Sequence, residues 1–252
     1  MPYLALDDIT IYYAIAGEGP PLALLHGAAL TIETNWSNQI PIFSRKYKVV
    51  AIDLRGHGRT NNPSNIMNYD TMAEDVAKFL DRLRFGKSHL IGFSMGGMIA
   101  ARIALSYPEL AKTLILCSSG YHVSREAQHL FAKSVDPKTM EETDLERADF
   151  YRRIHKKGRS NYWKRLLKQL IKSSRSKTDL NDLSKINVPT LIIVGDQDPY
   201  GFTRQAIEMH DVIRGSELAV FPDIGHLIPN KKPRLFNETV LDFLERRGSQ
   251  TS

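Results

Sequence analysis

The chain has 252 residues, of which 42% are hydrophobic and 25% charged, and it carries a formal net charge of +6. This length fits one large α/β domain or two small ones, and the composition is ordinary for a globular protein. No stretch approaches the roughly 18 uninterrupted apolar residues of a membrane span, so no stable membrane insertion is expected. The N-terminal residues lack a basic start and a long apolar segment, which argues against a secretory signal. The only cysteine, Cys117, excludes an intrachain disulfide, so we expect a cytoplasmic protein.

Strand-like and helix-like segments alternate along most of the chain. The first, Ile9–Ala16, is rich in β-branched and aromatic residues between turn signals, which is typical of a hairpin strand. Continuous apolar runs, expected for strands covered on both faces, follow at 21–25, 48–52, 88–91, 113–117, 190–194 and 218–221. Helical segments are predicted at 70–83, 95–107, 203–213 and 234–246. This alternation predicts a mainly parallel sheet with helices on both faces.

Residues 121–187 interrupt the alternation. They include 16 Lys or Arg and 9 Asp or Glu, against 18 and 19 in the remainder, so this segment carries the whole charge imbalance. Two amphipathic helices are predicted here, one opened by a capping box at Thr139-Met140-Glu141-Glu142 and one running from Trp163 to Ile171. We interpret residues 121–187 as a helical cap inserted after the sixth strand, with residues 1–120 and 188–252 forming the core domain.

The basic residues of this segment fit three interpretations. A solvated charged face is the simplest, steering of an anionic substrate is the second, and attachment to a surface through the Trp163 helix is the third. Binding to nucleic acid is not expected, because no recognised module accompanies the charge. The apolar side of the helix is typical of the roof of a pocket, which favours a hydrophobic substrate.

The segment Gly92-Phe93-Ser94-Met95-Gly96 lies between a predicted strand and a predicted helix. In that context the G-x-S-x-G pattern indicates a sharp turn that exposes a serine hydroxyl at the carboxyl edge of the sheet. The glycines are needed where the strand and the helix approach too closely for side chains. Ser94 is therefore the candidate nucleophile, and the Met95 N–H at the helix start faces any anion formed beside it.

A serine hydroxyl needs a neighbouring base, and the base needs an acid that orients it. Among the eight histidines, His226 alone follows the last predicted strand directly before the final helix. Asp196 and Asp198 both follow the preceding strand, and Asp223 is a third candidate. We favour Asp198, since Asp196 could serve to cap the turn.

The second donor to an oxyanion is expected in the loop after the strand 21–25. The Ala28 N–H is the first candidate and the Ala29 N–H the fallback, and each donor of this kind is worth roughly 3–4 kcal/mol on the barrier. His26 and His57 lie in glycine-containing loops near the same edge. We expect these two histidines to shape the loops rather than to transfer protons.

Together these motifs resemble the α/β-hydrolase fold family over nearly the whole chain. The matching segments are His26-Gly27, Asp53-Leu54-Arg55-Gly56-His57-Gly58-Arg59-Thr60, Gly92-Phe93-Ser94-Met95-Gly96-Gly97, Gly195-x-x-Asp198 and Gly225-His226. The resemblance implies an eight-stranded, mostly parallel sheet. It also supports Asp198 as the acid, because that family usually places the acid three residues after this glycine.

The resemblance implies a carboxylesterase-like serine hydrolase that cleaves a small, hydrophobic ester, lactone or thioester through an acyl-enzyme. The alternatives are a C–C bond hydrolase, a perhydrolase or haloperoxidase-like enzyme, and a non-catalytic ligand receptor. Serine at position 94 argues against haloalkane dehalogenases and epoxide hydrolases. No cysteine pair, His-x-x-x-His pattern or dinucleotide fingerprint occurs, so neither a metal nor a cofactor is expected. The expected partner is a small-molecule acyl substrate, and the sequence leaves open whether the chain forms a homo-oligomer.

Overall fold

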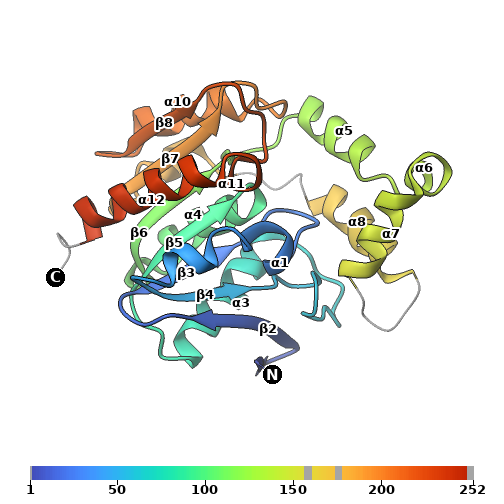
Figure 1. Cartoon of the computed structure of the whole chain (residues 1–252), viewed down its shortest axis with the longest axis horizontal. Helices are drawn as coiled ribbons and strands as arrows, with labels where there is room; N and C mark the ends of the chain where they lie inside the picture. The colour runs from blue at the N-terminus through green and yellow to red at the C-terminus, as the bar shows by residue number, and fades with distance from the viewer. Residues whose placement is uncertain (1, 156–160, 174–177, 249–252) are drawn as a thin grey trace.

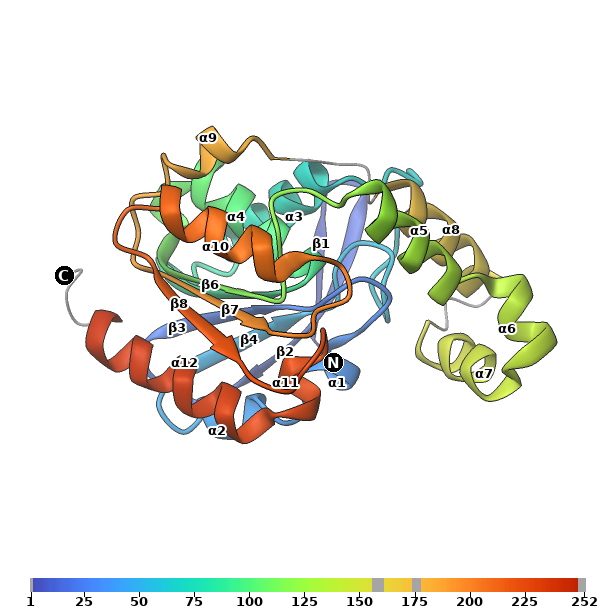
Figure 2. The same cartoon turned by 90° about the horizontal axis from the view of Figure 1, so that it is seen from above.

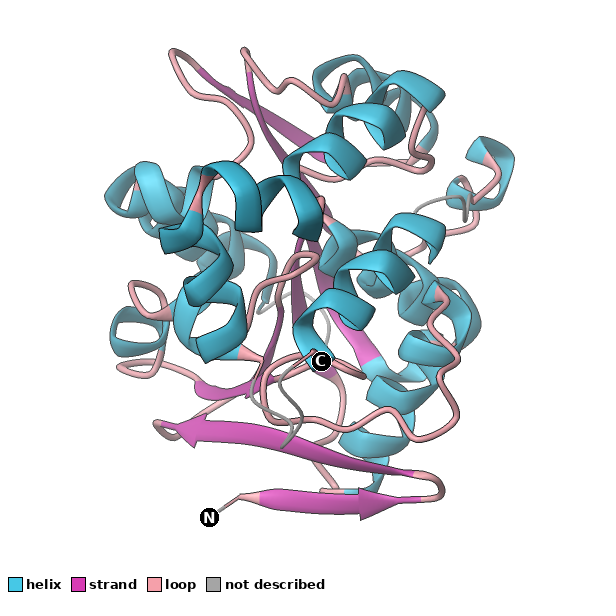
Figure 3. Ribbon diagram, turned by 90° about the vertical axis from the view of Figure 1, so that its right-hand side faces the viewer, coloured by secondary structure: helices cyan, strands magenta, loops and turns pink. Residues whose placement is uncertain are grey.

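An eight-stranded sheet forms the centre of the molecule in the computed structural model, which describes residues 2–155, 161–173 and 178–248 (Figure 1). The strands are β1 (Tyr3–Leu6), β2 (Ile9–Ala16), β3 (Pro21–Leu25), β4 (Lys48–Ile52), β5 (Ser88–Phe93), β6 (Ala111–Cys117), β7 (Thr190–Gly195) and β8 (Glu217–Phe221). Their order is β1-β2-β4-β3-β5-β6-β7-β8. The hairpin β1–β2 forms one edge and pairs antiparallel with β4, and all later pairs are parallel (Figure 3). The predicted mainly parallel sheet is confirmed.

Helices cover both faces of the sheet (Figure 2). One face carries α3 (Tyr69–Arg82), α4 (Met95–Ser106) and α10 (Phe202–Val212), and the other carries α1 (Ile32–Trp36), α2 (Ile40–Phe43), α11 (Ile228–Lys231) and α12 (Pro233–Gly248). A short 3₁₀ helix, η1 (Pro108–Leu110), precedes β6. The four long core helices agree with their predicted ranges to within one or two residues. Among the described helices, none has both the length and the apolar character needed to cross a bilayer.

The continuous apolar strands follow from this two-sided cover. In β3, Ala23 and Leu25 pack with one cluster of buried side chains, whereas Leu22 and Leu24 pack with the other. Successive strand residues point to opposite faces, so a strand covered on both sides needs apolar residues at every position. Strands β5, β7 and β8 are therefore held in place by packing on both faces of the sheet. The candidate site lies at their carboxyl ends.

Between β6 and β7 the described residues form helices and the loops that join them, and no strand. These are α5 (Arg125–Ser134), α6 (Pro137–Thr143), α7 (Leu145–Ile154), α8 (Tyr162–Ser173) and α9 (Leu180–Leu183). Helices α5–α8 lie together at one end of the molecule, beyond the sheet (Figures 1 and 2). By contrast, α9 contacts α4 and α10. On α8 the apolar side, including Trp163 and Leu167, is buried, whereas Lys168 and Lys172 are exposed.

The predicted capping box at Thr139 is wrong. Helix α6 begins at Pro137, and its cap is Asp136, whose carboxylate accepts the Thr139 N–H at 2.8 Å and also the Thr139 hydroxyl at 2.8 Å. An aspartate cap followed by proline at the first helical position is a stronger start than a threonine three residues after that cap. Thr139 therefore lies inside the first turn.

The loop 53–60 is folded around a buried carboxylate. Asp53 accepts the backbone N–H groups of Ile32 and Arg59, both at 2.9 Å. Gly58 has φ +51°, and a Cβ there would lie 2.1 Å from Asp53 Oδ2, so only glycine fits. Arg55 forms a buried ion pair with Asp75 (Nε–Oδ2 2.6 Å) that anchors the loop to α3. This loop holds His57 against the chain that follows β3.

Candidate active site

Ser94 lies on a strained turn between β5 and α4. Its backbone has φ +52° and ψ −117°, a conformation that L-residues rarely adopt. Two hydrogen bonds hold it there: the Ser94 N–H donates to the Cys117 carbonyl at 2.8 Å, and the Ser119 hydroxyl donates to the Ser94 carbonyl at 2.9 Å. The turn projects the hydroxyl from the carboxyl edge of the sheet, as a nucleophile elbow does.

The neighbouring glycines permit close backbone packing around this turn. A Cβ on Gly92 would lie 2.3 Å from the Gly96 carbonyl oxygen, so the entry and exit of the turn leave no room for a side chain. A Cβ on Gly96 would lie 2.1 Å from the Leu25 carbonyl oxygen, which places α4 directly against the end of β3. The position of Ser94 is thus set by backbone contacts.

The structure brings Ser94, His226 and Asp198 together from three separate loops. His226 Nε2 lies 2.9 Å from Ser94 Oγ, and His226 Nδ1 lies 2.8 Å from Asp198 Oδ2. The Asp198 side chain is fully buried, and its Oδ1 accepts the Tyr200 N–H at 2.9 Å. An ionised carboxylate only accepts, so Nδ1 carries the proton and Nε2 is free to accept the Ser94 hydroxyl. This arrangement can activate a serine for nucleophilic attack.

The other two candidate acids lie elsewhere. Asp196 is exposed, and its carboxylate accepts the Ile224 N–H at 3.2 Å. Hydrogen bonds from the backbone of Asp223 and Ile224 lower the pKa of Asp196. Asp223 is also exposed and accepts a long hydrogen bond of 3.5 Å from the Gln197 amide. Asp196 therefore ties the loop after β7 to the loop after β8, and neither carboxylate reaches His226.

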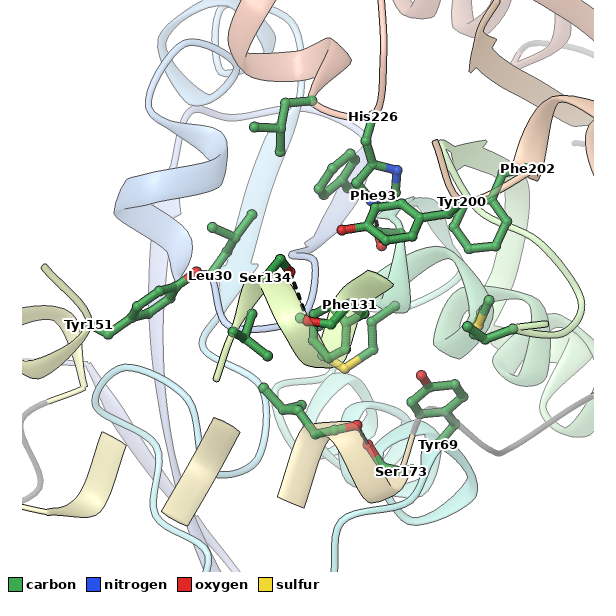
Figure 4. A pocket seen from close by; sticks show the side chains of 18 residues that line it. Leu30, Tyr69, Phe93, Phe131, Ser134, Tyr151, Ser173, Tyr200, Phe202 and His226 are labelled. Atoms are coloured by element: carbon green, nitrogen blue, oxygen red, sulfur yellow. Dashed lines mark hydrogen bonds between the residues drawn. The ribbon is translucent and has the colours of Figure 1, made fainter. Parts of the chain in front are cut away.

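An aromatic group that the sequence analysis did not single out surrounds the His226 ring. Ring centroids lie 4.7 Å away for Tyr200, 5.1 Å for Phe93 and 5.8 Å for Phe202, and Figure 4 shows the three grouped beside His226. Phe93 directly precedes Ser94 and Tyr200 follows Asp198 by two residues, and this proximity is the signal that the sequence contains. These rings restrict the orientation of the imidazole and keep it largely out of solvent.

Two backbone N–H groups belong to residues that line the cavity beside Ser94. Ala28 and Met95 both line it, and neither N–H has an acceptor within the described ranges 2–155, 161–173 and 178–248. The Ala29 N–H instead donates to His57 Nε2 at 3.3 Å, so the fallback donor is already used. Two unpaired donors beside a serine hydroxyl are suited to receive a developing oxyanion.

His26 and His57 hold the loops after β3 and β4. His26 Nδ1 donates to the Gly27 carbonyl at 2.8 Å and its Nε2 accepts the Leu54 N–H at 3.0 Å, while His57 Nδ1 donates to the Arg55 carbonyl at 3.0 Å. Burial lowers the pKa of each ring to about 3, so both are neutral. Neither lies within reach of Ser94, and their role in shaping the loops agrees with the expectation from sequence.

A cavity of about 210 Å³ opens above Ser94. Part of its wall comes from helices α5, α7 and α8 and their ends, and the rest from the core (Figure 4). The wall residues are Ala28, Leu30, Tyr69, Phe93, Ser94, Met95, Met98, Val123, Phe131, Ser134, Val135, Tyr151, Leu170, Ser173, Tyr200, Phe202, His226 and Leu227. Among these described residues there is no Lys, Arg, Asp or Glu, and the polar groups are mainly hydroxyls. Nor does the described part of the chain contain a cluster of three or more His, Cys, Asp or Glu that could hold a metal ion.

The two aspartates after β7 give a matched pair of substitutions. Asp198→Asn is expected to lower kcat by about 10⁴-fold, because an amide at this position favours the wrong imidazole tautomer. Asp196→Asn removes an exposed charge and is expected to change kcat less than about threefold. Initial rates on one substrate measure both. Equal losses in the two variants would contradict the assignment of Asp198 as the partner of His226.

The fold and this arrangement of groups define the class of protein. A family model described as the alpha/beta hydrolase fold matches residues 20–149, and the chain belongs to this family. One relative, the 2-hydroxy-6-oxo-6-(2'-aminophenyl)hexa-2,4-dienoic acid hydrolase of Metapseudomonas resinovorans, is 27% identical over 257 residues, which cover 95% of this chain and 89% of that protein.

Solved structures agree with this membership. An N-acyl homoserine lactone degrading enzyme has a TM-score of 0.78 and 27% identity, with 96% of this chain and 100% of that chain covered. An enol-lactonase from Burkholderia xenovorans has a TM-score of 0.81 at 22% identity, with 97% and 100% covered, which is a likeness of fold alone. The two proteins of higher identity are thus a dienoic acid hydrolase and a lactone degrading enzyme.

Proposed function

We propose that this protein is a serine hydrolase that cleaves small, uncharged carboxylic esters, lactones or thioesters with an apolar acyl group. The observation that carries this proposal is the hydrogen-bonded series Ser94–His226–Asp198 at the floor of an apolar cavity. Membership in a hydrolase family supports the reaction class, and the character of the cavity wall supports the choice of substrate.

The proposed reaction has two halves. His226 Nε2 takes the proton of Ser94 as the hydroxyl attacks the carbonyl carbon, and Asp198 stabilises the imidazolium that forms. The N–H groups of Ala28 and Met95 stabilise the oxyanion. His226 then protonates the leaving group, an acyl-enzyme remains on Ser94, and water activated by the same imidazole releases the acid.

The substrate is proposed to be uncharged because the described wall offers no cation. A carboxylate moved into an apolar cavity without a partner loses its hydration at a cost of several kcal/mol. The basic side chains of α8, such as Arg165, Lys168 and Lys172, are exposed and lie outside the wall. Of the interpretations of these basic residues, a solvated charged face is therefore favoured over electrostatic steering of an anionic substrate.

We also propose that residues 121–187 act as a cap over a core made of residues 1–120 and 188–252. Phe131 and Ser134 of α5, Tyr151 of α7 and Leu170 of α8 contribute to the wall opposite the serine. A wall divided in this way lets the strand ends supply the chemistry while the helices select the acyl group.

A matched pair of esters tests the proposed substrate. Hydrolysis of p-nitrophenyl hexanoate is compared with that of the p-nitrophenyl monoester of adipic acid, which has the same chain length and ends in a carboxylate. We expect kcat/KM to be at least about 10²-fold higher for the uncharged ester, with little change between low and high ionic strength. Comparable values for the two esters, or faster hydrolysis of the acid that weakens with salt, would contradict an uncharged substrate.

A C–C bond hydrolase is the second candidate, and similarity to the dienoic acid hydrolase over almost the full chain favours it. The substrate named for that relative is an acid, and its carboxylate finds no cation in the described wall. Measured loss of the dienoate chromophore gives the comparison. A kcat/KM for that acid above the value for the best ester would make C–C cleavage the better assignment.

A further inference from the structure

His155, the residue that follows α7, is buried and contacts two loops of the core. Its side chain is almost inaccessible, and its Nδ1 accepts the Gly58 N–H at 3.0 Å. Its Nε2 lies 3.1 Å from the Ala29 carbonyl oxygen. Because the Gly58 N–H only donates and the Ala29 carbonyl only accepts, the ring is the neutral tautomer with its proton on Nε2. Both ring nitrogens are therefore satisfied by backbone groups far away in the sequence.

Ala29 needs outside support to hold its conformation. Its φ is +59°, in the left-handed region that residues other than glycine seldom occupy. Its N–H is held by His57 at 3.3 Å and its carbonyl by His155, so each peptide group next to this residue is bonded to one imidazole. The two rings contact each other edge to face, with centroids 5.8 Å apart and an interplanar angle of 74°. Together they fix both peptide planes that follow the Ala28 N–H.

Helix α7 contributes to the cavity wall one turn before His155. Tyr151 lines the cavity, and its ring stacks on His155 with centroids 6.2 Å apart and an interplanar angle of 8°. A group bound against Tyr151 is thus linked through His155 to the loop that carries Ala28. His155 itself does not line the cavity, so it has no direct access to a substrate.

We propose that His155 is a positioning residue for the oxyanion hole: by its hydrogen bond to the Ala29 carbonyl it fixes the peptide planes that follow the Ala28 N–H, and so helps to orient this donor. The orientation then depends on how α7 packs against the core. The inference rests on the proposed function, because it assigns a task in the same reaction. Other anchors hold the preceding peptide groups: the Asn35 carboxamide oxygen accepts the Gly27 N–H at 3.0 Å. The Leu30 N–H at 3.2 Å and His26 Nδ1 at 2.8 Å donate to the Gly27 carbonyl, which shares a peptide plane with the Ala28 N–H. His57 and His155 hold the two peptide planes that follow.

Two substitutions separate the two hydrogen bonds. In His155→Gln the amide nitrogen occupies the place of Nε2 and keeps the donor to Ala29. In His155→Asn the shorter amide occupies the place of Nδ1, keeps the contact with Gly58 and leaves the Ala29 carbonyl unpaired. We expect kcat to fall about 10- to 100-fold in His155→Asn with KM changed less than about threefold, and to stay within about threefold of wild type in His155→Gln.

Inhibitor affinity gives a readout that general destabilisation does not move. A trifluoromethyl ketone forms a tetrahedral adduct with an oxyanion on the serine, whereas the carboxylic acid product does not. In His155→Asn the Ki of the ketone is expected to rise in parallel with the loss of kcat, with the Ki of the acid unchanged. His129→Asn, an exposed histidine of α5, serves as the matched control and should change neither. Active-site titration with a fluorophosphonate corrects every value for the fraction of folded protein.

Equal kcat in the Asn and Gln variants, or an unchanged ketone Ki in folded His155→Asn, would overturn the proposal. If His155→Asn does not fold, His155→Leu fills similar space without either bond and should show the same loss, while a folded His155→Gln with weakened ketone binding would count against the role. Failure of the proposed function has a different signature: wild-type protein would then neither hydrolyse esters nor react with the fluorophosphonate.

Discussion

Replacing Ser94 with alanine is expected to lower kcat on the best ester by up to about 10⁶-fold, because the members of such a triad act as a unit. Without the hydroxyl, His226 has no proton to take and no acyl-enzyme can form. Residual hydrolysis then depends on water and on the two N–H donors of Ala28 and Met95. Alanine keeps the Cβ that the strained turn already accommodates, so the variant should fold normally.

Initial rates with a p-nitrophenyl ester measure this loss, and fluorophosphonate labelling reports the same site independently. Wild-type protein should take up one label per chain, and Ser94→Ala none. Ser106→Ala, at the exposed end of α4, is the matched control and should retain full activity. Esterase activity that survives in Ser94→Ala, after purification from any contaminant, would remove the proposed mechanism.

Acidification is expected to destabilise the fold strongly from about pH 6.5 down to about pH 3. His26, His57 and His155 are buried, and burial lowers the pKa of each to about 3. In the unfolded chain a histidine titrates near 6.5. Between these values the unfolded chain binds more protons than the folded one, so stability is complete above pH 6.5 and falls as the pH is lowered. At pH 5 the loss is about 2 kcal/mol for each histidine, or about 6 kcal/mol for the three.

Urea unfolding at pH 8, 6.5 and 5 measures the effect. His89, whose pKa burial lowers to about 4, adds in the same direction. Asp53, whose pKa is raised by burial, opposes it at the acid end of the range. His155→Gln should reduce the slope of the free energy of unfolding against pH by roughly 1.4 kcal/mol per pH unit, because one proton fewer is taken up on unfolding. A free energy of unfolding that stays constant from pH 7 to pH 5 would show that these histidines titrate normally in the folded protein.

The core could be predicted from the sequence because its signals are strong and local. A strand buried on both faces, such as β3 or β7, must be apolar throughout, and a helix such as α3 repeats its apolar residues at helical spacing. Helices α5–α7 were harder to predict because they are short and only partly buried. Their starts depend on single caps such as Ser124, Asp136 and Asp144, and the pattern led to the wrong start at Thr139.

The positions of Ser94, Asp198 and His226 could be predicted because each follows a strand of a parallel sheet, and the strand ends meet at one edge. The sequence already placed the Ala28 N–H ahead of that of Ala29, but the reason that the Ala29 N–H is not free, its bond to His57, is one that no local pattern reveals. The contact of His155 with Ala29 spans 126 positions, so it is a product of tertiary packing alone.

The close approach of α4 to the end of β3 has a consequence for engineering new specificity. No side chain fits at Gly92 or Gly96, so substitutions within the turn cannot reorient Ser94. Changes in specificity therefore have to come from the helices that line the cavity. Exchange of residues 125–173 for those of a relative is the natural graft. If His155 has the role proposed above, the exchanged segment must also supply a hydrogen-bond donor to the Ala29 carbonyl, as His155 does here. Compatibility between the two parts then depends on this one hydrogen bond.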